Sequence, residues 1–233
     1  MKTSEFARRL RSGVLICGVG LFFASVAASS AQAQFYAGAL GGVSTLSGDT
    51  SAAIHSTATN FSTYNPQNGP ALNGLFGRHF NDFFSAQGDY VWNRNSLNFI
   101  GAAVDSGMLA DYEEMRQSSQ QSLFISALIY FRRRRSWVRP YLSVGTGWVH
   151  LSSTEQKIIL TQGSPALPPN EFSSNLIALR VPVGIDVRLH DGWRLRYTFA
   201  ETLSKNPISD ELSPPGPHSF KNFQNLIGIV REF

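Results

Sequence analysis

The clearest feature of the chain is a strict alternation of apolar and polar positions. Between positions 177 and 189 every odd residue is Ile, Leu or Val, and every even residue is Ala, Arg, Pro, Gly or Asp. A two-residue period places successive side chains on opposite faces of an extended strand. Positions 193–199 repeat the pattern, and positions 84–93 repeat it with one valine on the polar side. These stretches are therefore predicted to be strands with one apolar and one polar face.

The same pattern along the chain predicts an all-β protein. Eight segments qualify as strands, at 35–46, 71–81, 83–95, 119–131, 138–151, 174–189, 193–205 and 219–233. The connections alternate between short turns, at 81–82, 132–137 and 190–192, and long polar loops, at 47–70, 106–118, 152–173 and 206–218. This asymmetry is typical of bacterial outer-membrane barrels. We expect an eight-stranded antiparallel up-and-down transmembrane β-barrel that displays four extracellular loops.

Alternation alone does not say which face points inward, because a soluble barrel of the lipocalin kind would bury its apolar face. Two observations favour lipid on the outside. Aromatic residues lie toward the segment ends on the apolar face, namely Trp92, Trp148, Trp193 and Tyr197. The polar faces are rich in Gly, Ser and Ala, which suit a narrow lumen. We therefore expect the apolar face to contact membrane lipid.

The first residues have the features of a cleavable signal peptide. A basic start precedes an apolar run at 13–28, and Ala31 and Ala33 supply small residues at a cleavage site. The alternative is a membrane-anchoring helix, but the run is shorter than the about 20 residues that span a bilayer. The prediction is a signal peptide over 1–33 and a barrel domain over 34–233.

Charge and cysteine content bear on nucleic-acid binding and on disulfide formation. The chain has 20 Lys and Arg against 16 Asp and Glu. Four of the basic and one of the acidic residues lie in 1–33, which leaves 16 against 15 in the rest. This balance gives no support for nucleic-acid binding, which needs a clustered basic face. The single cysteine, Cys17, lies in the apolar run of the signal, so no disulfide is expected in the mature protein.

The segments 35–41 (FYAGALG) and 139–147 (RPYLSVGTG) carry a family resemblance. The chain resembles the small eight-stranded outer-membrane barrels of the OmpA and OmpX type. The resemblance implies a bacterial outer membrane of the Gram-negative type, with outer-membrane lipid and the outer-membrane assembly machinery as partners.

The resemblance extends to the assembly signal at the carboxyl end. That signal is matched at Gly228 and Phe233, and it departs at Leu226, where a polar residue is usual, and at Arg231, where an aromatic residue is usual. The resemblance implies that the assembly machinery reads this end. The last segment is also expected to close the barrel against the first.

Three functions fit such a barrel, because one fold serves many roles. The first is a non-catalytic surface or structural barrel, and the second is a narrow porin-like channel. The third is a lipid A-modifying enzyme, since His150 and Ser152 resemble the His-x-Ser of lipid A deacylase barrels. Ser153 stands where that family has Asn, and Glu155 and Glu171 do not fall at its acidic spacing. No enzyme, cofactor or metal site is predicted, and the sequence identifies no extracellular ligand.

One group of inward charges is predicted from the register. A three-residue connection at 190–192 pairs Arg188 with Arg194 and Asp186 with Arg196. We expect Asp186 to lie in the lumen among the guanidinium groups of 188, 194 and 196, with Arg180 on the same face. The run of four arginines at 132–135 is interpreted as a solvated turn, with contact to anionic headgroups or peptidoglycan as the alternative.

Overall fold

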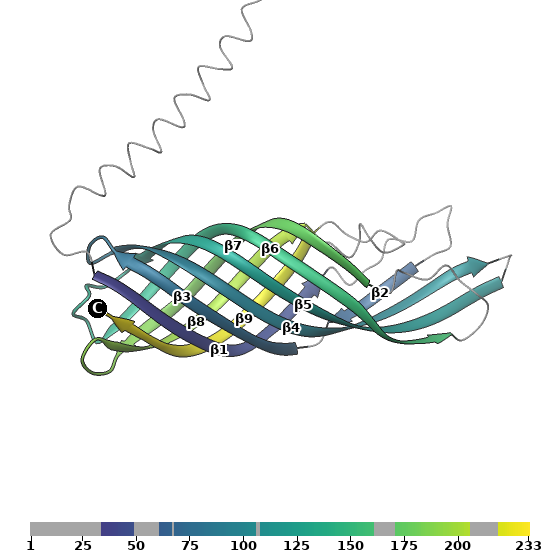
Figure 1. Ribbon diagram of the computed structural model, residues 1–233, viewed down its shortest axis with the longest axis horizontal. Helices are drawn as coiled ribbons and strands as arrows, with labels where there is room; N and C mark the ends of the chain where they lie inside the picture. Colours follow the sequence, from purple (N-terminus) through teal and green to yellow (C-terminus); the bar gives the residue numbers. More distant parts are fainter. Residues whose placement is uncertain (1–33, 49–60, 67, 106–107, 161–170, 206–218) are drawn as a thin grey trace, which may run out of the picture.

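The computed structural model describes residues 34–48, 61–66, 68–105, 108–160, 171–205 and 219–233 (Figure 1). The predicted signal peptide, with Ala31 and Ala33, lies outside these residues, as do the whole of the predicted long loop 206–218 and parts of the other three. Among the described residues, no helix is long and apolar enough to cross a membrane.

Eight strands form a closed antiparallel barrel. They are β1 (Gln34–Gly48), β3 (Asn68–His79), β4 (Phe84–Asp105), β5 (Met108–Tyr130), β6 (Val138–Leu160), β7 (Glu171–Arg188), β8 (Trp193–Lys205) and β9 (Ser219–Glu232). Each strand pairs with its neighbour around the ring, and β9 pairs with β1 to close it. The short β2 (Phe61–Pro66) pairs with the far part of β4. The predicted strand count, antiparallel order and closure are confirmed.

The strands run further than the sequence predicts. β4 and β5 pair as far as Asp105 opposite Met108, so β5 begins within the predicted loop 106–118, and in Figure 1 this hairpin projects beyond the rest of the barrel. β6 and β7 extend into the predicted loop 152–173, and β2 lies in the predicted loop 47–70. The loop assignments are wrong for these residues. In the missed part of β5, Glu113 and Gln117 share the face of exposed Met115, and Glu114 and Arg116 are buried on the other face, so no apolar alternation marks the strand there.

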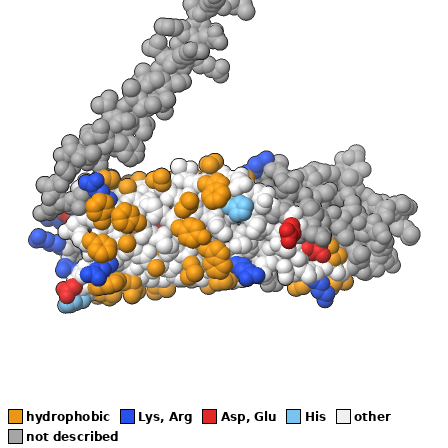
Figure 2. All heavy atoms as spheres, viewed as in Figure 1, with side chains coloured by type: hydrophobic (Ala, Val, Ile, Leu, Met, Phe, Trp, Pro, Cys, Tyr) orange, Lys and Arg blue, Asp and Glu red, His pale blue; other side chains and the backbone are white. Residues whose placement is uncertain are grey.

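The wall is apolar outside and polar inside, the reverse of a soluble barrel. Along β8 the side chains alternate between an exposed set, Trp193, Leu195, Tyr197 and Phe199, and a buried set, Arg194, Arg196, Thr198 and Ala200. Figure 2 shows apolar side chains spread over the outer wall of the described barrel. The predicted orientation of the two faces is therefore confirmed.

The turn between β7 and β8 sets the register of both strands. Asp191 and Gly192 have φ values of 44° and 80°, which close the reversal at His190. The Leu189 amide donates to the Trp193 carbonyl at 2.9 Å. The pairs that follow include Arg188 with Arg194 and Asp186 with Arg196, as predicted.

The seam between the first and last strands is very close. The Phe233 amide donates to the Phe35 carbonyl at 2.8 Å, just past the end of β9. Gly228 faces Leu40 across the seam, and a Cβ atom at 228 would lie 2.1 Å from the Ala39 carbonyl oxygen. Backbone atoms fill the space that a side chain would need, so the seam requires glycine at this position.

We expect Gly228→Val to prevent closure, because its Cβ would overlap the backbone of β1. Gly74→Val is the matched control, since a Cβ at Gly74 meets no atom within 4 Å. A closed barrel resists SDS until it is boiled. Electrophoresis of unheated samples should therefore show the compact form for the wild type and Gly74→Val, and its loss for Gly228→Val. Retention of the compact form by both variants would contradict this account of the seam.

Candidate functional site in the barrel lumen

An ion pair between the neighbouring strands β7 and β8 lies inside the lumen. Arg196 on β8 donates to both carboxylate oxygens of Asp186 on β7, at 2.6 and 2.7 Å, and both side chains are 1% exposed. The same guanidinium donates at 2.8 Å to Gln87 on β4 and at 2.8 Å to the Tyr130 hydroxyl on β5. It also lies 4.9 Å from the centre of the Tyr141 ring. Because β4 lies opposite β8 in the ring of strands, this one side chain links opposite walls.

A second charged pair lies further from the short turns. Arg180 on β7 lies 3.4 Å from Asp89 on β4, and it donates to Gln224 on β9 at 3.0 Å. Asp89 also accepts from Gln87 at 2.8 Å and from Asn73 at 3.2 Å. Charges and amides from four strands therefore meet in this part of the lumen.

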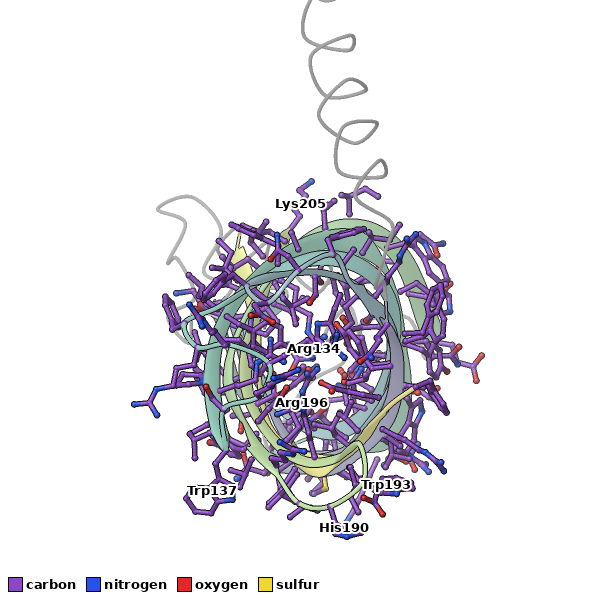
Figure 3. All side chains as sticks on the ribbon, turned by 90° about the vertical axis from the view of Figure 1, so that its left-hand side faces the viewer. Arg134, Trp137, His190, Trp193, Arg196 and Lys205 are labelled. Carbon is purple, nitrogen blue, oxygen red and sulfur yellow. The ribbon has the colours of Figure 1, made fainter. Side chains whose placement is uncertain are left out.

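The lumen mouth at the short-turn end is organised by Glu232, near the end of β9. Its carboxylate lies 2.7 Å from Arg194, 3.2 Å from His79, 3.5 Å from Arg134 and 3.7 Å from Arg139. These partners come from β8, β3, the turn after β5, and β6. A single carboxylate thus ties together four parts of the rim. Figure 3, which looks along the barrel from this end, shows Arg134 near the centre of the opening.

The arginine run at 132–135 is exposed, as a solvated turn should be, except at Arg134. Arg134 turns into the mouth, and its carbonyl accepts from Arg194 at 2.6 Å. Arg139 holds the turn by donating to the carbonyls of Asp82 at 2.9 Å and Arg132 at 3.4 Å. The other three arginines of the run are exposed. The run itself was visible in the sequence, but which arginine points inward depends on the backbone of the turn.

Neutral polar side chains occupy the lumen toward the long-connection end. Asn222 on β9 donates at 3.1 Å to Asn93 on β4 and at 3.1 Å to Gln120 on β5. Still further along, buried Arg116 forms an ion pair with Glu114 and donates to the Ser153 hydroxyl at 3.1 Å. The polar network therefore continues beyond the charged centre of the barrel.

The structure divides the predicted lumen charges among three carboxylates. Asp186, Arg194, Arg196 and Arg180 are buried in the lumen, but Arg188 is exposed at the end of β7. Arg196 is the guanidinium that binds Asp186, whereas Arg194 binds Glu232 and Arg180 binds Asp89. The expectation that Asp186 lies among three guanidinium groups is thus replaced. Residues two apart on one face are separated by ~6.6 Å along a strand, so each arginine reaches a different carboxylate.

His150 and Ser152 do not form a catalytic arrangement. His150 lies on the outer face, where its Nδ1 is 3.0 Å from the Asn175 side-chain oxygen and its ring stacks on Trp148 at 5.7 Å. A His–Ser pair of a hydrolase needs a carboxylate that orients the imidazole, and here an amide occupies that place. In the part of the chain that the structure describes, no group of three or more His, Cys, Asp or Glu side chains is placed to hold a metal ion.

Comparisons with known proteins fit this geometry. A model of the outer membrane protein beta-barrel domain family matches residues 14–225. Neisserial surface protein A is 15% identical over 87% of this chain and 99% of its own, with a TM-score of 0.50. The outer membrane protein OprG from Pseudomonas aeruginosa is 14% identical over 88% and 98%, with a TM-score of 0.48. The likeness to the Neisserial protein supports the fold alone. A search of curated proteins gave no match.

We expect Asp186→Ala to lower the free energy of unfolding by about 3–5 kcal/mol, because it leaves the Arg196 guanidinium buried without its carboxylate. Glu201→Ala is the matched control, since Glu201 pairs with Lys221 on the surface at 4.0 Å, and such pairs contribute about 0–1 kcal/mol. Urea unfolding in lipid vesicles, followed by tryptophan fluorescence, measures both. Equal losses would show that the Asp186 site is hydrated.

Proposed function

The chain belongs to the outer membrane protein β-barrel domain family, and from this premise we propose that it is a non-catalytic barrel that displays its long connections at the bacterial surface. Its location is the bacterial outer membrane. The apolar outer wall suits the hydrocarbon of that membrane, and the closed ring leaves no strand edge unpaired there.

The filled lumen is the observation that carries this proposal. Arg196 bridges opposite walls, and Glu232 gathers Arg134 and Arg194 across the short-turn mouth. In an eight-stranded barrel the interior is just wide enough for side chains. A scaffold for surface segments agrees with this packing better than an open pore does.

A narrow channel is the second candidate function, and one observation favours it. Some buried polar atoms in the lumen have no hydrogen-bond partner among the described residues, including Asp89 Oδ2 and Arg180 Nε. Lumen water would satisfy such atoms. Conduction along this water would require the Asp89–Arg180 contact to separate, because the two side chains meet inside the barrel.

We further propose that the assembly machinery recognises the carboxyl end, where Phe233 is exposed on the outer face of the barrel. The guanidinium of Arg231, which departs from the usual signal, lies 5.6 Å from the Phe233 ring and 5.2 Å from the Trp193 ring. An arginine stacked on aromatic rings presents a surface that is partly aromatic in character. The departure at 231 is therefore compatible with the signal.

The proposed topology places the short turns in the periplasm and the β4–β5 hairpin outside the cell. Single cysteines test it, since the one native cysteine lies in the predicted signal peptide. Gln156 is exposed on the part of β6 that lies far from the short turns. Gln156→Cys should therefore react with a membrane-impermeant maleimide on intact cells. His190→Cys, in a short turn and 85% exposed in the structure, should react only after the outer membrane is permeabilised. The reverse pattern would overturn the topology.

The filled lumen also predicts electrical silence. Protein purified from outer membranes and inserted into planar bilayers should give no discrete current steps, because side chains occupy the barrel cross-section. Flotation with lipid vesicles controls for insertion. Regular steps from protein that floats with the vesicles would move the assignment to the channel.

A further inference from the structure

A basic cavity lies beside the mouth that Glu232 closes. It has a volume of about 240 Å³, and its lining includes four arginines, Arg134, Arg135, Arg188 and Arg194. Two carboxylates, Asp82 and Glu232, also line it, so the cations outnumber the anions by two. The Asp186–Arg196 and Asp89–Arg180 pairs lie inside the barrel, whereas this cavity has a surplus of positive charge at the rim.

One of these arginines has an unused donor. Arg194 is 3% exposed, and its Nε and Nη2 bind Glu232 and the Arg134 carbonyl. Its Nη1 is buried and has no hydrogen-bond partner among the described residues. A buried cationic donor without an acceptor is costly, so an anion at this position would stabilise it. Glu232 does not fill this role, because its carboxylate already lies against Arg194 Nε and three further groups.

The aromatic residues around the rim show where this cavity lies in the membrane. Trp193 lines the cavity and is 40% exposed, and Trp137 and Phe233 are 70% and 65% exposed. Figure 3 shows Trp137 and Trp193 pointing away from the barrel axis. Exposed aromatic side chains of outer-membrane barrels gather at the level of the lipid headgroups. The cavity therefore opens at the depth where phospholipid phosphates lie.

We propose that this cavity binds the phosphate of an anionic phospholipid headgroup. Arg194 supplies the buried donor, and Arg135 and Arg188 supply exposed guanidinium groups that reach the same anion. The acyl chains of that lipid would continue along the apolar wall beside Trp193. The proposed topology places the short turns in the periplasm, and this lipid would then lie in the inner leaflet of the outer membrane. The choice of leaflet rests on that topology, whereas binding itself does not.

The test uses protein purified from outer membranes and exchanged into nanodiscs that contain phosphatidylglycerol or phosphatidylethanolamine. Native mass spectrometry counts the lipid molecules that stay bound after the protein is released from the nanodisc. We expect phosphatidylglycerol to be retained preferentially, and Arg135→Gln with Arg188→Gln to weaken this retention at least about tenfold. Both side chains are exposed, so the barrel should stay closed, which its unheated mobility on SDS gels verifies.

The matched control is Arg132→Gln with Arg133→Gln, which also removes two positive charges from this rim, but at positions outside the cavity lining. It should change retention less than twofold. Equal losses in the two double variants would show general attraction to a basic rim and would overturn the site. Displacement of the lipid by an equal concentration of inorganic phosphate would assign the site to a soluble anion instead. Failure of the cysteine topology would change the leaflet and leave these binding results intact.

Discussion

Backbone hydrogen bonding in a medium without water is the constraint on which this structure depends. Each unsatisfied amide or carbonyl in hydrocarbon costs several kcal/mol, so a sheet that crosses the membrane must close on itself. Here closure depends on the β1–β9 pairing, which runs from Tyr36 opposite Glu232 to Gly48 opposite Phe220. The lack of a side chain at Gly228 lets the two backbones approach. The barrel's lumen, rim and outer wall all follow from this closure.

Closure creates a second requirement, because the inward side chains then share a narrow space. The wall is thin, so each apolar residue that faces lipid leaves its neighbour facing the lumen. The chain fills the lumen with charges and amides that satisfy one another, such as Asp186 with Arg196 and Asn222 with Asn93. It also uses apolar packing on one side, where Leu40, Leu75 and Leu226 form a buried cluster. Bonds of this kind between strands restrain the lumen side chains, which suits a scaffold.

The sequence predicts the strand segments whose outer face must be apolar because it contacts lipid. It misses the strand extensions in which both faces are polar. Strands are visible where one face must be apolar, as along β7 and β8. On β5, polar Glu113 and Gln117 share a face with Met115, and Glu114 and Arg116 lie on the other face, so this part of the strand was predicted as a loop. In the site, Asp186 and Arg196 were predictable because a short turn fixes their register. Glu232 was not, since its partners meet only when the whole barrel closes.

The same physics explains why exposed guanidinium groups are tolerated at the short-turn rim. Deep in the lumen a guanidinium without an acceptor would be costly, and Arg196 accordingly has four hydrogen bonds. At the rim, water and headgroups supply acceptors, so Arg135 and Arg188 remain exposed without such a cost. Arg194 lies at the boundary between these environments: two of its nitrogens complete the lumen network, and the third has no hydrogen-bond partner in the part of the chain that the structure describes. An anion from the membrane interface would supply the missing acceptor for Arg194, which joins the lumen network to the rim.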